Sequence, residues 1–179
     1  MSFASRRSFL IGATSIAALA SGAGMASAAP NMIVYHDPNC GCCGGWVAHM
    51  RRAGFQVRVI DADDLAAIKT RFRVPSDLAS CHTAEVDGYV IEGHIPALAI
   101  QRLLAEKPEA AGLAVPGMPT GSPGMEAPGA PNEIYDVILF GPSGKRSYAR
   151  IEGPRALYPD SLKIRGFVLR FAVGRIPMG

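Results

Sequence analysis

The stretch YHDPNCGCCG, residues 35–44, joins a short apolar run to a segment whose apolar residues recur with helical spacing. The apolar run at residues 32–35 predicts a strand, which the following HDPN sequence breaks. Cys43, Val47 and Met50 then fall on one face of a helix. The stretch therefore predicts the passage from a first strand into a first helix, with three cysteines where the helix begins.

The rest of the chain continues the alternation of strands and helices. Asp87-Gly88 predicts a hairpin turn, and glycine and proline dominate a long loop at residues 112–132. The predicted strands are 55–60, 83–86, 89–92, 135–140 and 146–151, and the predicted further helices are 65–72 and 96–106. This order predicts a thioredoxin-like α/β domain over residues 29–152. It would have a mixed sheet with flanking helices, a Gly/Pro-rich loop and a C-terminal hairpin.

Four cysteines carry the chemistry that the sequence suggests. Cys40 and Cys43 form a C-x-x-C pair at the predicted helix start, where free N–H groups and the helix dipole stabilise a thiolate. Cys42 adds a third sulfur within reach. Cys81 is distant in sequence, but in a thioredoxin-like fold it precedes the third strand beside the same helix start. We therefore expect a sulfur cluster, with His82 as a candidate nitrogen ligand.

Two methionines in the Gly/Pro-rich loop extend the candidate ligand set. Met118 and Met125 each follow a Pro-Gly pair, and a flexible loop offers them little core to fill. Thioethers and thiolates are soft ligands that suit copper(I). The sequence thus predicts a copper site, with copper(I) preferred. Zinc is the weaker alternative, since three thiolates and one imidazole would also suit its tetrahedral geometry.

These motifs resemble those of a bacterial family, domain of unknown function family 411, a thioredoxin-like metal-binding group of CopG-like copper-resistance proteins. The resemblance spans about residues 32–151 and rests on four segments: YHDPNCGCCG at 35–44, SCHT at 80–83, EGHIP at 92–96 and the paired PGM sequences within 112–125. It implies an exported protein that handles copper, with other envelope copper-handling proteins as expected partners. The family pattern stops at the tail, residues 153–179.

Other interpretations of the cysteines remain open. Cys40 could act as the nucleophile and Cys43 as the resolving thiol of a thiol-disulfide oxidoreductase. The cysteines could also be structural, with Cys40–Cys43 as the favoured disulfide. A c-type haem would need histidine at position 44, where the chain has glycine. His36 and His94 are interpreted as surface or hydrogen-bonding residues, His94 being the better ligand candidate of the two, and His49 as an ordinary helix residue.

The two ends of the chain predict export and leave the tail uncertain. Residues 5–10, SRRSFL, are typical of a twin-arginine leader, and an apolar stretch and an A-x-A sequence at 26–28 follow. We expect residues 1–28 to be a signal peptide of a periplasmic protein. The alternative, a membrane anchor, needs a longer apolar run. Residues 153–179 form a basic, apolar tail, through which alone we expect any membrane association.

Charge argues against a nucleic-acid partner. The whole chain has a formal charge of +3, but residues 30–152 carry 11 Lys or Arg and 14 Asp or Glu. The predicted domain therefore lacks the basic surface that binding to phosphates requires. We expect a metal ion, and no nucleic acid, as its partner.

Overall fold

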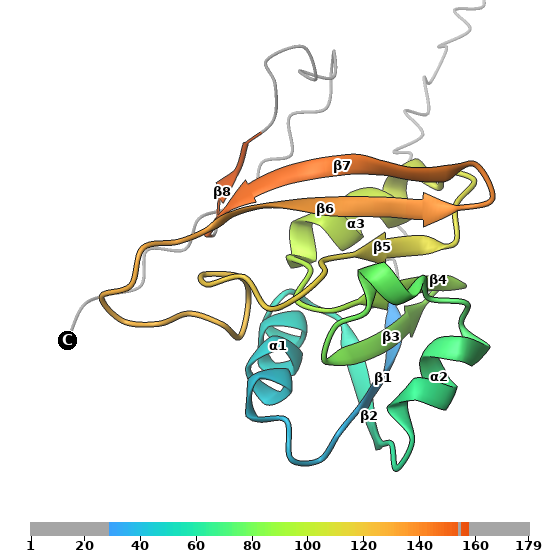
Figure 1. Cartoon of the computed structure of the whole chain (residues 1–179), viewed down its shortest axis with the longest axis horizontal. Helices are drawn as coiled ribbons and strands as arrows, with labels where there is room; N and C mark the ends of the chain where they lie inside the picture. Colours follow the sequence, from blue (N-terminus) through green and yellow to red (C-terminus); the bar gives the residue numbers. More distant parts are fainter. Residues whose placement is uncertain (1–28, 154, 158–179) are drawn as a thin grey trace, which may run out of the picture.

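A computed structural model describes residues 29–153 and 155–157 of the chain. They form a mixed α/β fold in which helices cover both faces of one eight-stranded sheet (Figure 1). The predicted signal peptide, residues 1–28, and nearly all of the predicted tail lie outside the described residues. Among those described, no helix combines the length and the apolar character needed to cross a membrane.

The element order confirms the predicted alternation. The strands are β1 (Asn31–His36), β2 (Gln56–Asp61), β3 (His82–Val86), β4 (Tyr89–Glu92), β5 (Gly112–Ala114), β6 (Ile134–Gly141), β7 (Gly144–Glu152) and β8 (Arg155–Ala156). The helices are α1 (Gly41–Arg52), α2 (Leu65–Arg71) and α3 (Ala97–Glu106), with a short 3₁₀ turn η1 (Ser76–Leu78). In the sheet the strands follow the order β2-β1-β3-β4-β5-β6-β7-β8.

The first unit of the fold is a parallel pair of strands joined by a helix. β1 and β2 pair in parallel, and α1 crosses between them. Trp46, Val47 and Met50 are buried on the face of α1 that packs against the sheet. The structure thus confirms the helix that the spacing predicted. The packing of this helix fixes the orientation of the cysteines in its first turn.

Turn and cap residues set the next boundaries where the sequence indicated them. Asp64 caps α2, because its carboxylate accepts the backbone N–H of Ala67 at 2.9 Å. Asp87 and Gly88 have φ angles of 47° and 80°, as the tight turn between β3 and β4 requires. Pro96 precedes α3, as predicted.

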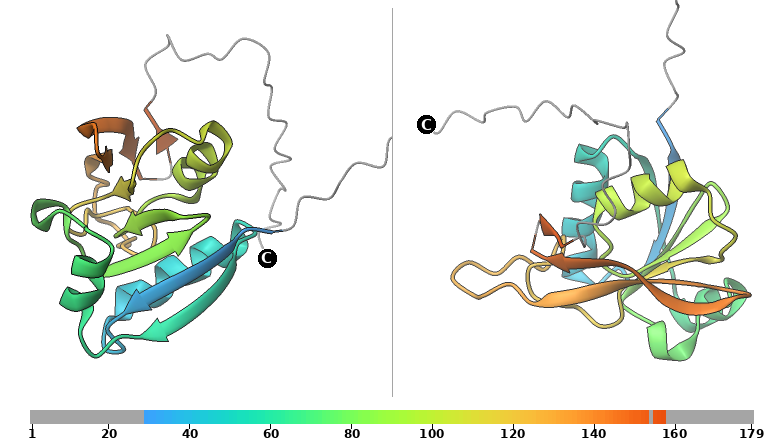
Figure 2. Two further views of the ribbon diagram at one scale, coloured as in Figure 1. Left: turned by 90° about the vertical axis from the view of Figure 1, so that its right-hand side faces the viewer. Right: turned by 90° about the horizontal axis from the view of Figure 1, so that it is seen from above.

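Helices α1 and α3 cover one face of the sheet, and α2 with η1 covers the other (Figure 2). The larger core contains Trp46 and Met50 of α1, Ile100 and Leu103 of α3, and the inward residues of the strands. A smaller cluster on the second face joins η1 and the loop after α2 to β4, β5 and β6. The sheet thereby brings the ends of β1, β3 and β4 to the start of α1.

Two strands correct the sequence-based boundaries. The predicted loop 112–132 begins with β5, because its first residues pair with β4 on one side and with β6 on the other. Gly112 permits this close approach, since a Cβ there would lie 1.9 Å from the carbonyl oxygen of Val90. β8 pairs with β7 beyond residue 152, where the predicted domain ended.

Candidate metal centre

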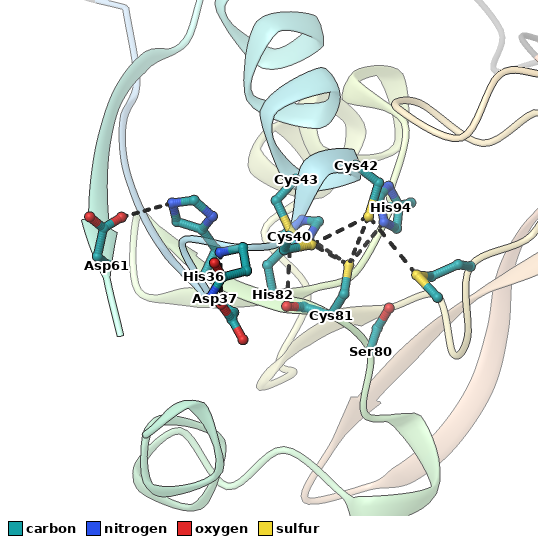
Figure 3. The surroundings of a disulfide bond; sticks show 12 residues. His36, Asp37, Cys40, Cys42, Cys43, Asp61, Ser80, Cys81, His82 and His94 are labelled. Atoms are coloured by element: carbon teal, nitrogen blue, oxygen red, sulfur yellow. Dashed lines mark hydrogen bonds and ion pairs between the residues drawn. A yellow bond between two sulfur atoms is a disulfide. The ribbon is translucent and has the colours of Figure 1, made fainter. Parts of the chain in front are cut away.

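Four cysteine sulfurs lie together at the start of α1 (Figure 3). A disulfide joins Cys40 and Cys43, the pair that the C-x-x-C spacing favoured. The Sγ of Cys42 lies 3.4 Å from that of Cys40 and 3.8 Å from that of Cys81. The Sγ of Cys81 lies 3.7 Å from that of Cys43, so the four atoms form a closed ring within 4.8 Å of one another.

The local sequence explains how three of these cysteines reach one point. The backbone N–H of Cys40 donates to the carbonyl of Asp37 at 2.9 Å, and the Asp37 carboxylate accepts the N–H of Asn39 at 2.8 Å. This turn ends β1 and leaves Cys40 as the N-cap of α1. Cys42 and Cys43 then occupy the first turn of the helix, where unpaired N–H groups favour negative charge.

Cys81 comes to the cluster from the segment before β3, as the sequence predicted. The N–H of Ser80 donates to a Glu92 carboxylate oxygen at 2.6 Å, and the Ser80 hydroxyl donates to the carbonyl of Gly117 at 2.6 Å. These bonds fix the residue next to Cys81. Burial, together with neighbouring Cys42, raises the pKa of the Cys81 thiol to about 12. Without a cation nearby Cys81 is therefore a neutral thiol.

Two histidines lie against Cys81, and both are fully buried. The Nδ1 of His82 is 3.3 Å from the Cys81 sulfur, and the Nε2 of His94 is 3.0 Å from it. The other ring nitrogen of His94, Nδ1, lies 2.8 Å from the carbonyl oxygen of Pro123, so it must carry the proton. In His82 the second nitrogen, Nε2, is buried and has no hydrogen-bond partner among the described residues.

Burial keeps both rings uncharged. Desolvation lowers the pKa of His82 well below its ordinary value, and nearby His94 lowers it further. Desolvation also lowers the pKa of His94, although its bond to Pro123 opposes the shift. A neutral imidazole has a free lone pair, which is the form that binds metals.

The two methionines of the loop take different positions. The Met118 side chain is 52% exposed, and its sulfur accepts a contact from the Cys42 thiol at 4.0 Å. Met125 is partly buried, and the structure records no hydrogen bond between its thioether and the described cysteines. Of the two thioethers predicted as ligands, the structure brings that of Met118 to the cluster.

The remaining histidines lie in different surroundings. The Nε2 of His36 contacts the Asp61 carboxylate at 3.1 Å, at the ends of β1 and β2. His49 accepts the N–H of Ala97 through Nε2 at 3.3 Å, which ties α1 to the start of α3. His49 is thus a helix-packing residue.

The buried carboxylate of Glu92 supports the site, a role that the sequence motifs did not predict. One oxygen accepts from Ser80 and from the ammonium of Lys69, and the other accepts from the Thr83 hydroxyl at 2.7 Å. Three elements, α2, β3 and β4, thereby hold the segment that carries Cys81. The sequence did contain one sign of this role, because Glu92 is a charged residue at the end of an otherwise apolar strand.

The cluster can supply different donors in its two redox states. With the Cys40–Cys43 bond closed, two thiols remain, at Cys42 and Cys81. With the bond open, all four cysteines, whose sulfurs lie within 4.8 Å of one another in the disulfide form, could each provide a thiolate. Soft sulfur donors at this spacing fit a soft metal ion.

Comparisons with known proteins agree with this chemistry. The family model "protein of unknown function, DUF411" matches residues 78–125. The structure resembles that of copper resistance protein CopG in its form 1, with a TM-score of 0.64 and 41% identity over 69% of this chain and 98% of that one. Form 2 gives a TM-score of 0.62 and 39% identity over 73% and 99%. A comparison with curated proteins gave no match. On this similarity in sequence and structure, the chain belongs to the DUF411 family of CopG-like copper-resistance proteins.

Proposed function

We propose that the chain is a periplasmic protein that binds copper(I) through Cys40, Cys42, Cys43 and Cys81 and serves copper handling or resistance. One observation carries the proposal: four cysteine sulfurs from two separate segments lie within 4.8 Å of one another. Thiolates are soft ligands, which suit copper(I) better than they suit zinc, an ion of borderline softness. Zinc is therefore the weaker candidate.

The surrounding residues would prepare these sulfurs for a cation. The N-terminus of α1 offers its positive end to Cys42 and Cys43. Cys81 has a raised pKa, so a metal ion that binds its sulfur would have to displace the thiol proton. His82 and His94 bring neutral rings to the same sulfur, and Met118 stands at the exposed side as a thioether donor. Met125 would be a metal ligand only if its loop moved to bring the thioether to the cysteines.

The location and the domain limits belong to the same proposal. The leader at residues 1–28 would direct export by the twin-arginine pathway, and the site would lie in a thioredoxin-like domain over residues 29–152. The names of the two similar structures, copper resistance protein CopG, support a role in copper resistance. Other envelope proteins that handle copper would be the partners.

The experiment is a competition between the reduced chain and a copper(I) chelator without oxygen. Replacement of Cys40, Cys43 or Cys81 by serine should each weaken copper(I) binding at least about tenfold, or about 1.4 kcal/mol. Val47→Ala, a truncation on the same helix that removes no donor, serves as the matched control. If the triple serine variant binds copper(I) as tightly as the unaltered chain, this site is not the copper site.

A thiol-disulfide oxidoreductase is the second candidate, because Cys40 and Cys43 form a disulfide at a helix start. Such an enzyme needs those two cysteines alone. Cys40→Ser and Cys43→Ser would then abolish the reduction of a disulfide substrate, whereas Cys42→Ser and Cys81→Ser would preserve it. We expect weak activity in the unaltered chain, and rapid turnover would favour the enzyme.

A further inference from the structure

The thioether of Met118 is open to oxidants in solution. Its side chain is 52% exposed, whereas Met32 and Met50 are buried in the core. Peroxides convert a thioether into a sulfoxide, in which the sulfur carries one oxygen atom. The Met118 sulfur also lies 4.0 Å from the thiol of Cys42. A sulfoxide at position 118 would therefore form beside a thiol, a group that can reduce it.

Backbone geometry holds Met118 beside Cys42. The Ser80 hydroxyl donates to the carbonyl of Gly117 at 2.6 Å, which ties the loop to the residue before Cys81. Gly117 has a φ of 71°, in the left-handed region that glycine adopts without strain, so the chain can turn there. Two groups that are held together in this way react as if each were present at a very high concentration. A reaction that is slow between separate molecules becomes intramolecular here.

The reduction of a sulfoxide consumes two thiols, and Cys81 provides the second. Its sulfur lies 3.8 Å from that of Cys42 (Figure 3), and both residues are free thiols. Cys40 lies nearer to Cys42, at 3.4 Å, but its sulfur is already joined to Cys43. The sulfurs of a disulfide are about 2.0 Å apart, so a small approach would join Cys42 to Cys81. The cluster thus keeps a reactive pair of thiols while its first disulfide is closed.

We propose that Cys42 reduces a sulfoxide of Met118 in the same chain and that Cys81 completes the reaction. In the first step the S–O bond at Met118 breaks as an S–O bond forms at Cys42, and the thiol proton ends on that oxygen. The Met118 sulfur gains two electrons and becomes a thioether, while the Cys42 sulfur loses two and becomes a sulfenic acid. In the second step the Cys81 sulfur bonds to that of Cys42, and the hydroxyl group leaves with the Cys81 proton as water.

The cycle needs an oxidant, a reductant and no metal. A peroxide supplies the oxygen of the sulfoxide, and an external dithiol reduces the new disulfide and returns both thiols. The net result is the repair of Met118 at the expense of the dithiol. This activity goes beyond metal binding, and it stands or falls independently of the proposed function.

The test follows individual methionines of the metal-free chain by peptide mass spectrometry. The cysteines are first protected as mixed disulfides with a small thiol, and hydrogen peroxide then oxidises the methionines. After the peroxide is removed, a dithiol frees the cysteines and starts the reaction. We expect the Met118 sulfoxide to be lost at least about tenfold faster than the Met125 sulfoxide. Both rates come from one unaltered chain, so the comparison does not depend on the folding of a variant.

Variants of the cysteines identify the reacting thiol. Cys42→Ser should slow the repair of Met118 to the rate of Met125. The matched control, Cys40→Ser with Cys43→Ser, removes two sulfurs but keeps both reacting thiols, and its repair rate should stay within about threefold of the unaltered chain. Equal rates for the two methionines, or unchanged repair in Cys42→Ser, would overturn the inference.

Ile134→Met separates position from exposure. Ile134 is 53% exposed and lies at the start of β6, in register with Glu152. A sulfoxide there would be as open to the dithiol as one at Met118. It should nevertheless persist as the Met125 sulfoxide does. Repair at position 134 as fast as at Met118 would show that exposure alone governs the rate, and the inference would fail.

The part of Cys81 is tested by trapping the sulfenic acid with dimedone during the repair. The chain that lacks Cys40 and Cys43 should form little adduct at Cys42, because Cys81 consumes the sulfenic acid. Addition of Cys81→Ser to that chain should raise the amount of adduct at least about threefold. A further Met118→Leu should remove this gain. Equal labelling with and without Cys81 would overturn its assigned role.

Discussion

At the scale of single residues, Met118 shows how little of a ligand set can be settled by sequence. Both PGM sequences looked equivalent, yet the structure brings the Met118 sulfur to 4.0 Å from Cys42 and records no such contact for Met125. A thioether carries no charge, and Met118 is 52% exposed, so its contribution must be smaller than that of a thiolate.

Met118→Leu should therefore weaken copper(I) binding by the reduced chain only a few-fold, less than the tenfold expected for a cysteine. Leucine keeps the size and apolar character of the side chain but removes its sulfur. Met125→Leu is the matched control and should bind as the unaltered chain does. Chelator competition measures both variants. Equal losses in the two variants would mean that the loop moves to place both thioethers on the metal.

Cys81 sets the expected pH dependence of copper binding. Its pKa of about 12 means that a proton occupies the sulfur at every ordinary pH and that the metal must displace it. Raising the pH lowers the proton concentration and so favours the metal. Apparent copper(I) affinity should rise by up to about tenfold per pH unit for each proton released. Cys81→Ser should reduce that slope between pH 6 and pH 8, and an unchanged slope would contradict the assignment.

At the scale of elements, the Gly/Pro-rich loop is held close to α1. A Cβ at Gly45 would lie 2.9 Å from the backbone Cα of Gly124, whereas one at Gly44 would meet nothing within 4 Å. Both glycines lie in α1, so alanine should favour the helix equally at both. The two substitutions differ in one respect, because the new Cβ at position 45 would collide with the loop and the one at position 44 would not.

Gly44→Ala should thus leave copper binding unchanged and stabilise the chain by up to about 1 kcal/mol. Gly45→Ala should lower the stability, because a backbone atom cannot give way as the end of a side chain can. It should also weaken copper(I) binding, since the same loop carries Met118 and, through Pro123, orients His94. Thermal unfolding and chelator competition measure the two effects. Identical behaviour of the two variants would show that the loop does not depend on this contact.

Glu92 links α2, β3 and β4 behind the cluster. Its side chain is fully buried, and its partner Lys69 is only 15% exposed. Glu92→Gln leaves the Lys69 ammonium without its counter-charge and should destabilise the chain by about 3 kcal/mol. The exposed pair Lys145–Asp77 is the control, and Asp77→Asn should cost much less stability, because solvent screens an exposed ion pair. Urea unfolding compares them, and equal losses would contradict a special role for the buried pair.

At the scale of the whole molecule, the periodicity of apolar residues and the turn residues were enough to predict most of the fold. The helical face of Cys43, Val47 and Met50 and the Asp87-Gly88 turn are local signals, and the structure confirms both elements. β5 escaped prediction because three residues are too few to show a period. The contact between His94 and Cys81 also escaped it, because it depends on how β4 and the loop meet, which no local pattern records.

The same packing makes the stability of the metal-free chain sensitive to acid. Burial, and then the nearby His94, lowers the pKa of His82 well below its value in the unfolded chain, about 6.5. Below that pH the unfolded chain takes up a proton at His82 that the folded chain does not. Stability is therefore complete above about pH 6.5 and falls as the pH is lowered, by up to about 1.4 kcal/mol per pH unit for this one group.

Urea unfolding of the metal-free, disulfide-containing chain at pH 7.0 and pH 5.5 measures this loss. His94 and His49, whose pKa values burial also lowers, add to the total slope. The contribution of His82 is therefore read as the difference between the unaltered chain and His82→Gln, which should lose less stability over the same interval. Equal losses in the two chains would mean that His82 is solvated or protonated in the folded state.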